Sequence, residues 1–187
     1  LRPLLGAAVL STAATWLQVL VMAAVLAPGA FGVVLPPVVA GAAVALGLGG
    51  LLWRGDGHGA APLSAPAGGP LRLRAALGIS ALLAAVAAGV HLGRMWLGDA
   101  GLFVSLGIAA MADAHAPVNT LLSLHAGDQI DGRHLVRGVL LAISVNSVTR
   151  AIVAVASGGA RYGAGVAAAL AAGTAAASAT VLLLARA

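Results

Sequence analysis

The chain has 187 residues, of which 61% are hydrophobic and 8% are charged, and its mean hydropathy is +1.05. A soluble domain carries about 25% charged residues, so this composition excludes a soluble globular protein. The net charge of +5 comes from arginines that stand singly at segment ends without interleaved aromatics, which excludes a nucleic-acid surface. With no cysteine, disulfides and thiolate metal sites are excluded too. We therefore expect an all-α integral membrane protein whose surroundings are the lipid bilayer.

Two apolar runs open the chain, at residues 4–27 and 31–53. Each is long enough to cross a hydrocarbon core about 30 Å thick as a helix. Only Pro28, Gly29 and Ala30 separate them, and this short link predicts an antiparallel front hairpin over residues 4–53. Residues 54–74 are rich in Gly, Pro and Ala without helical or strand periodicity, which predicts a flexible loop.

A back helical block is expected over residues 75–187. Its four apolar runs cover residues 75–96, 100–126, 134–156 and 162–185. The second of these, the fourth in the chain, contains Pro117, which lacks a backbone donor and disfavours helix at the residue before it. We therefore expect this helix to be broken near Asp113 to Pro117. The whole of residues 1–187 is predicted to be a single transmembrane domain of about six helices, and its start just before a span predicts a fragment of a longer chain.

Arginine positions predict the orientation of the chain. With six crossings, one side would carry Arg2, Arg54, Arg72, Arg74, Arg133, Arg137 and Arg186. The other side would carry only Arg94 and Arg161. The positive-inside rule then places both termini in the cytoplasm. If the break were the tip of a re-entrant loop, the downstream half would invert and the asymmetry would weaken, so we favour a crossing.

Polar residues lie where two of the expected helices pass the middle of the bilayer. An ionisable residue there costs about 2.5 to 3.5 kcal/mol on insertion scales, so its presence needs an explanation. Because consecutive spans are usually neighbours, these residues can converge into an ion or substrate site, and they are Asp113, His115, Asn119, Asn146 and Arg150.

The donor chemistry of this group suits a divalent cation held by Asp113 and His115, or a proton relay through His115. Free carbonyls at the break would add to such a site. Arg150 argues against a simple cation cage, because a guanidinium repels a cation. The alternative is a structural ion pair between Asp113 and Arg150, with the histidine and the asparagines as hydrogen-bonding partners.

A polar stripe marks the first expected helix, where Ser11, Thr15 and Gln18 recur at helical spacing. These residues either line the same cavity or bond back to carbonyls of their own helix.

Small residues also recur at helical spacing in two of the expected helices. They are Gly41, Ala45 and Gly49 in the second helix and Gly165, Ala169 and Gly173 in the sixth. Such stripes allow close helix packing, within the chain or, alternatively, in a homo-oligomer.

Motifs of known enzymes are missing from the sequence. It contains no Gly-x-Ser-x-Gly, no His-Glu-x-x-His and no phosphate-binding glycine loop. We expect neither an enzyme nor a cofactor, and a divalent cation enters only as a possible substrate.

Several motifs resemble those of one membrane family. They are Arg2-Pro3-Leu4-Leu5-Gly6-Ala7-Ala8 with Thr15-Trp16-Leu17-Gln18, Gly98-Asp99-Ala100-Gly101-Leu102, Ala112-Asp113-Ala114-His115-Ala116-Pro117, and Asn146-Ser147-Val148-Thr149-Arg150 followed by Ser157-Gly158-Gly159-Ala160-Arg161. In order and spacing they resemble domain of unknown function 4010, the C-terminal membrane domain of MgtC/SapB-family bacterial proteins. Arg150 stands where that pattern has lysine, which keeps the charge but loses easy deprotonation.

The resemblance implies a multi-pass protein of the bacterial inner membrane, preceded in the same polypeptide by an MgtC-like membrane domain and linked to magnesium homeostasis. Together with the polar residues, it leads us to expect a transporter or channel module for a small ion, such as Mg²⁺ or another divalent cation. The alternative is a regulatory or scaffold module that transports nothing and binds another membrane protein.

Overall fold

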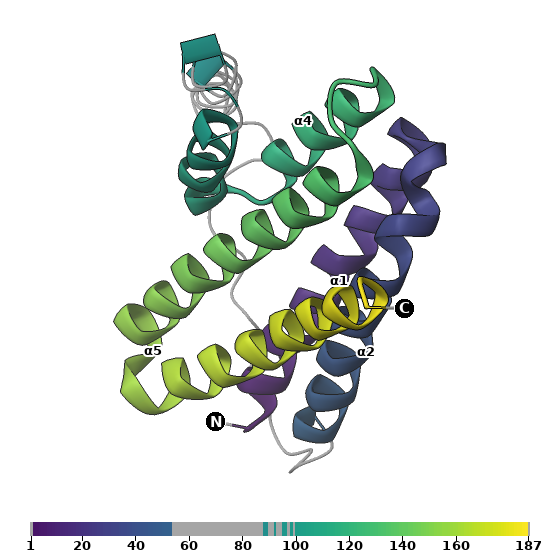
Figure 1. Cartoon of the computed structure of the whole chain (residues 1–187). Helices are drawn as coiled ribbons and strands as arrows, with labels where there is room; N and C mark the ends of the chain where they lie inside the picture. The colour runs from purple at the N-terminus through teal and green to yellow at the C-terminus, as the bar shows by residue number, and fades with distance from the viewer. Residues whose placement is uncertain are drawn as a thin grey trace, which may run out of the picture.

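The computed structural model describes residues 2–53 and 88–186, apart from 90–91, 93–94, 97 and 99. Every regular element in these ranges is helical. In chain order they are α1 (Arg2–Leu26), the 3-10 turn η1 (Pro28–Ala30), α2 (Phe31–Trp53), the helix Ala100–Ala112, α4 (His115–Ala126) and α5 (Gly132–Leu184) (Figure 1). The expected loop at residues 54–74 and most of the expected helix at 75–96 lie outside the described residues.

Helices α1 and α2 pack side by side as an antiparallel pair joined by η1. Glycines allow this close approach. A Cβ built on Gly41 would lie 2.6 Å from the ring of Trp16, and one built on Gly6 would lie 2.8 Å from the backbone nitrogen of Trp53. The predicted small-residue stripe of the second helix therefore serves contacts within the chain.

The 53-residue helix α5 consists of two arms that meet at Gly159. Gly159 has φ 79° and ψ 168°, a backbone conformation that is essentially restricted to glycine. The first arm (residues 132–158) and the second arm (residues 160–184) run back alongside each other from this bend (Figure 1). The fifth and sixth expected helices are thus the two arms of one element, with no loop between them.

The fourth expected helix is broken, as predicted, but its two halves do not form a crossing. The Phe103 ring stacks on His134 at the start of α5, with centroids 6.2 Å apart, and Ala110 further along is hydrogen-bonded to Asn146. The helix Ala100–Ala112 therefore runs along the first arm in the same direction. Helix α4 runs in the opposite direction, because its Leu121 packs on Gly138, which comes before Asn146 in the first arm. Both halves lie on the same side of the break and form a helical V (Figure 1).

The prediction of a crossing at residues 100–126 is therefore wrong. Helix α4 has 12 residues and is about 18 Å long, well short of the roughly 30 Å of a hydrocarbon core. In the described part of the chain, three helices are long and apolar enough to cross a membrane: Arg2–Leu26, Pro28–Trp53 and Gly132–Leu184. They indicate a multi-pass membrane protein, but the expected number of six helical spans is not what the structure shows.

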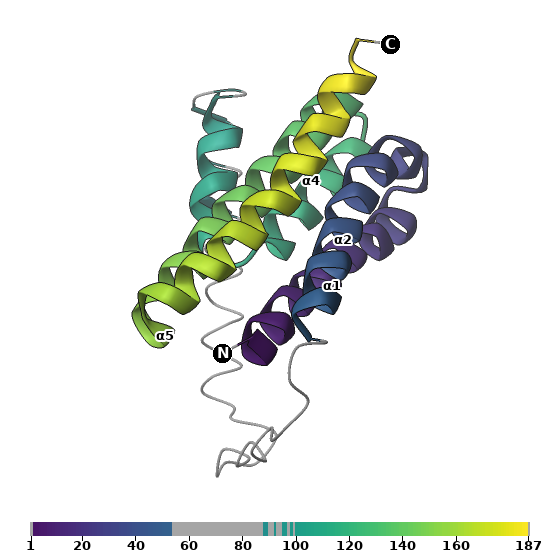
Figure 2. The same cartoon turned by 90° about the horizontal axis from the view of Figure 1, so that it is seen from below.

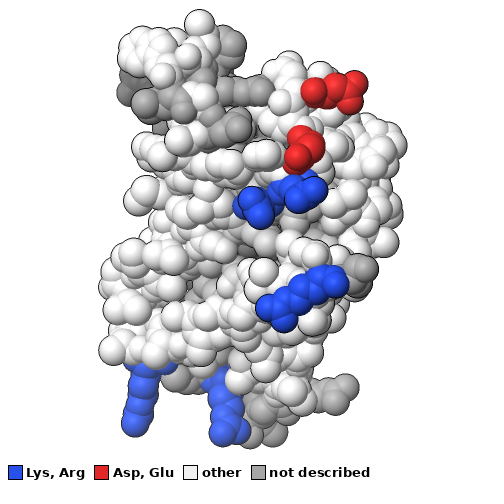
Figure 3. Space-filling model, viewed as in Figure 1, with Lys and Arg blue, Asp and Glu red and all other residues white. Residues whose placement is uncertain are grey.

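The core lies where the helical V meets α1, α2 and the first arm of α5. Its largest fully buried side chains include Trp16, Leu102, Leu106, Leu121 and Leu135. The outside is apolar as well: Val25 is 71% exposed and Leu183 is 67% exposed. Figure 3 shows a face that is largely uncharged, with a few charged side chains in separate places. This surface fits a bundle surrounded by lipid.

The second arm of α5 runs parallel to α1. Gly165 packs on Leu5, and further along Gly173 lies close to Trp16. The chain therefore begins and ends at opposite ends of the bundle (Figure 2). The prediction that both termini face the cytoplasm is wrong, because the V does not cross and one expected reversal of direction is lost. Arg161, at the start of the second arm, lies at the same end as Arg2.

Candidate functional site

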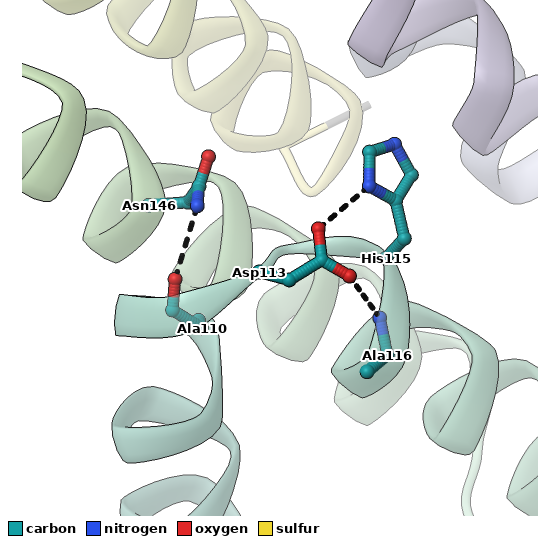
Figure 4. Close-up of polar contacts among 5 residues, drawn as sticks. All are labelled: Ala110, Asp113, His115, Ala116 and Asn146. Carbon is teal, nitrogen blue, oxygen red and sulfur yellow. Dashed lines mark hydrogen bonds and ion pairs between the residues drawn. The ribbon is translucent and has the colours of Figure 1, made fainter. Parts of the chain in front are cut away.

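Asp113 stabilises the break in the fourth helix by capping α4. Its Oδ2 accepts a 3.2 Å hydrogen bond from the backbone N–H of Ala116, and its Oδ1 lies 2.8 Å from Nδ1 of His115 (Figure 4). The first amides of a helix have no partner inside the helix, and a side-chain oxygen placed just before it supplies one. The carboxylate is thus bound within the V itself.

Asn146 holds the tip of the V to the first arm of α5. Its Nδ2 donates a 3.2 Å hydrogen bond to the carbonyl oxygen of Ala110, in the last turn of the preceding helix (Figure 4). The last carbonyls of a helix have no partner within it. The break therefore has a side chain at each end: Asp113 for the amides of α4 and Asn146 for a carbonyl of the helix Ala100–Ala112.

The second ring nitrogen of His115 is in a different situation. Nε2 is buried and has no hydrogen-bond partner in the described part of the chain. Leaving a buried polar atom unpaired costs about 1–3 kcal/mol. His115 is thus bound on one side to Asp113 and unpaired on the other.

A pocket of about 390 Å³ lies next to the tip of the V, between α1, the end of the helix Ala100–Ala112 and both arms of α5. Its lining combines apolar side chains with polar ones. The polar lining residues are Asn146, Thr149, Arg150, Ser157 and Tyr162. No carboxylate is among the described residues that line it.

Arg150 reaches from α5 across to α1. Its Nη2 donates a 2.9 Å hydrogen bond to Oγ of Ser11, and that hydroxyl donates at 2.7 Å to the carbonyl oxygen of Ala8. The expected alternative, an ion pair with Asp113, is not formed. Asp113 is bound to His115 and Ala116, and among the described residues Arg150 has no carboxylate partner.

Comparison with known families identifies the chain. A family model described as Domain of unknown function (DUF4010) matches residues 1–158. The chain belongs to this family. The match includes Asp113, His115, Asn146 and Arg150 and ends next to the bend at Gly159. No curated protein and no solved structure matches the chain.

The predicted site residues of this DUF4010 chain separate into two neighbouring groups. Asp113 and His115 form the tip of the V, Arg150 lies in the pocket, and Asn146 belongs to both. Asn119 is exposed on α4 and does not line the pocket. In the described ranges no group of three or more His, Cys, Asp or Glu side chains could hold a metal ion. The cation site at Asp113 and His115 remains a prediction.

The polar stripe of α1 is placed only in part beside the pocket. Ser11 touches Arg150, whereas Thr15 is half-buried and Gln18 is exposed, and neither lines the pocket. Sequence reasoning missed Tyr162, which the bend in α5 turns toward Arg150. A Gly-Gly pair inside an apolar run marks a turn, so the pair Gly158 and Gly159 was the available signal.

At the other end of the DUF4010 chain, Asp131 caps α5. Its Oδ1 accepts hydrogen bonds from the backbone N–H of His134 at 2.7 Å and from Nδ1 of the same residue at 2.9 Å. These bonds lower the pKa of Asp131 below its usual value of 3.8, the backbone bond contributing most. This carboxylate serves the fold and lies far along α5 from the pocket.

Proposed function

We propose that this DUF4010 chain is a transporter or channel module for a small ion in the bacterial inner membrane. The observation that carries the proposal is a helix broken inside an apolar bundle, with its tip next to a polar pocket of about 390 Å³. Irregular backbone at membrane depth is tolerated where it is buried in protein or lines a cavity. Broken helices form the ion sites of many transporters.

The packing around the pocket suggests how access would be controlled. The pocket lies between the tip of the V and the bend at Gly159. Behind the tip, the V is packed into the core through fully buried leucines, among them Leu102, Leu106 and Leu121. We propose that the V is the barrier and that its displacement opens the way past these leucines.

Mg²⁺ is one candidate for the transported ion, because the sequence resemblance implies a link to MgtC/SapB proteins and a preceding MgtC-like domain. Mg²⁺ requires near-octahedral oxygen ligands. In the described residues Asp113 is the carboxylate at the tip, and both of its oxygens are engaged with His115 and Ala116. A divalent cation at this place would have to displace those bonds.

The proposal is tested by measuring ion flux into proteoliposomes. Two salts are assayed separately: MgCl₂ as the source of a divalent cation and sodium benzoate as the source of a small organic anion. We expect Asp113→Asn and Asn146→Ala to abolish flux while the protein stays monodisperse in detergent. The matched control is Asp128→Asn, which changes an exposed aspartate in the turn before α5. Normal flux in both tip variants would refute a mid-membrane ion site.

A regulatory or scaffold module that binds another membrane protein remains the alternative proposal. The small residues that were expected to form its docking face are used inside the chain, since Gly165 packs on Leu5 and Gly173 lies near the carbonyl oxygen of Gly41. A partner would have to bind elsewhere. A stable partner that co-purifies with both the wild type and Asp113→Asn, without measurable flux in either, would favour this function.

A further inference from the structure

We propose that the pocket beside Arg150 binds a small monovalent organic carboxylate. This inference rests on the proposed function in one respect: it names the class of ion that the module would take. Binding itself can be measured without transport.

The charge of the pocket is the first argument. Arg150 stays protonated at any physiological pH, and none of the described lining residues carries a negative charge. Arg150 is half-buried. A guanidinium without a counter-charge in an apolar bundle is costly, and such residues usually have a partner of opposite charge. Among the described residues Arg150 has a hydroxyl partner only. A bound anion would supply the missing charge, whereas a cation would be repelled.

The available hydrogen-bond donors give the second argument. A guanidinium has five N–H donors, and one of those of Arg150 is directed to Ser11. The remaining donors can bind a carboxylate in the two-pronged arrangement that favours arginine at such sites. Ser11 accepts from Arg150 and is itself fixed to Ala8, so it acts as a positioning residue for the guanidinium.

The hydroxyl groups around Arg150 differ in whether they can donate a hydrogen bond to a ligand. Thr149 and Ser157 donate to carbonyl oxygens of their own helix, those of Val145 at 3.3 Å and Val153 at 2.7 Å. The Tyr162 hydroxyl makes no hydrogen bond within the described chain and can donate to a ligand. The donors directed at an anion would thus come from Arg150 and Tyr162, from two different arms of α5.

The volume of the pocket and its mostly apolar lining favour an organic anion over an inorganic one. The volume of about 390 Å³ falls in the range of small-molecule sites, which is roughly 300–1,000 Å³. The rest of the lining is apolar and includes Met111, Val153 and Val166. A charged head at Arg150 with a short apolar body fits this division better than a bare inorganic ion does.

Benzoate and its neutral analogue benzamide test the proposal by isothermal titration of the full chain in detergent. Both probes have the same ring and similar size, so micelle partitioning affects both. We expect benzoate to bind at least about ten times more tightly than benzamide, because a charge-assisted bond to arginine is lost in the amide. Arg150→Gln should weaken benzoate binding about ten- to hundredfold, to the level of benzamide.

Two further variants separate a specific site from general effects. Arg137→Gln removes an exposed arginine of the same arm and should leave benzoate binding unchanged. Ala112→Phe fills the pocket without changing its charge and should abolish binding. Equal binding of benzoate and benzamide, full binding by Arg150→Gln, or an equal loss in Arg137→Gln would overturn the proposal. Displacement of benzoate by phosphatidylglycerol at equimolar amounts would replace it with a lipid site.

The outcomes also separate this inference from the proposed function. Benzoate binding without any flux would uphold the carboxylate site and refute transport. Flux of MgCl₂ that depends on Asp113, without benzoate binding, would uphold transport and refute the carboxylate site.

Discussion

The side-chain amide of Asn146 binds the carbonyl oxygen of Ala110 at the point where the helix Ala100–Ala112 ends. We expect Asn146→Leu to lower the free energy of unfolding by about 1–3 kcal/mol, because a buried carbonyl loses its donor. Thermal unfolding in detergent measures this. The control Asn119→Leu changes an exposed amide on α4 and should stay within about 0.5 kcal/mol of the wild type. Equal effects of the two substitutions would contradict the role of Asn146.

The bend in α5 depends on the conformation of Gly159. Gly159→Ala should lower the free energy of unfolding by about 1–3 kcal/mol, since alanine rarely adopts φ 79° with ψ 168°. Gly47→Ala is the matched control: Gly47 is helical, and a Cβ built on it meets nothing within 4 Å. That substitution should stabilise the protein by up to about 1 kcal/mol. The bend would not need glycine if both variants shifted stability in the same direction.

The cap of α5 predicts a pH dependence at low pH. The pKa of Asp131 is lower in the folded chain than in the unfolded one, because the folded carboxylate accepts hydrogen bonds from His134. Its contribution to stability is therefore fully present above the unfolded pKa and is lost as the pH falls through the folded pKa. Asp131→Ala should be less stable than the wild type at pH 7, and the difference should shrink below about pH 4. A difference that stays constant down to pH 3 would contradict this.

The parallel course of α1 and the second arm predicts the membrane topology. Since the chain has no cysteine, single-cysteine variants can be labelled with an impermeant maleimide. Leu4→Cys and Ala160→Cys should react from one face of the membrane, and Gly29→Cys and Ala185→Cys from the other. Arg2 and Arg161 lie at the first of these ends and Arg133, Arg137 and Arg186 at the second, so the described arginines do not assign either end to the cytoplasm, and the labelling itself decides it. Labelling of positions 4 and 160 from opposite faces would restore a six-crossing topology.

Sequence patterns predicted the helical membrane bundle and the position of the break, because both depend on local properties. Pro117 is the third residue of α4, where its missing N–H lacks a partner in any helix. It therefore marks the start of α4 and explains why the break falls at Asp113 and Ala114. The membership of the chain in the DUF4010 family was also recognised from its motifs.

The direction of the chain after the break could not be predicted in the same way. It is determined by contacts between distant residues, such as Phe103 with His134 and Ala110 with Asn146, which leave no mark in hydrophobic periodicity. The same holds for the pocket. Arg150 was noticed for its charge, but its contact with Ser11 joins residues 139 positions apart, and Tyr162 comes close only through the bend at Gly159.

The distribution of hydrogen bonds at the tip has a mechanical consequence. Both contacts of Asp113 are made within the V and would travel with it as a unit. In the described part of the structure, the bond from Asn146 to Ala110 is the side-chain hydrogen bond that fastens the tip to α5. The V also contacts α5 through the Phe103 ring, which stacks on His134, and through Leu121, which packs on Gly138. Displacing the tip from α5 would therefore break the hydrogen bond of Asn146, whereas the two contacts of Asp113 would remain intact.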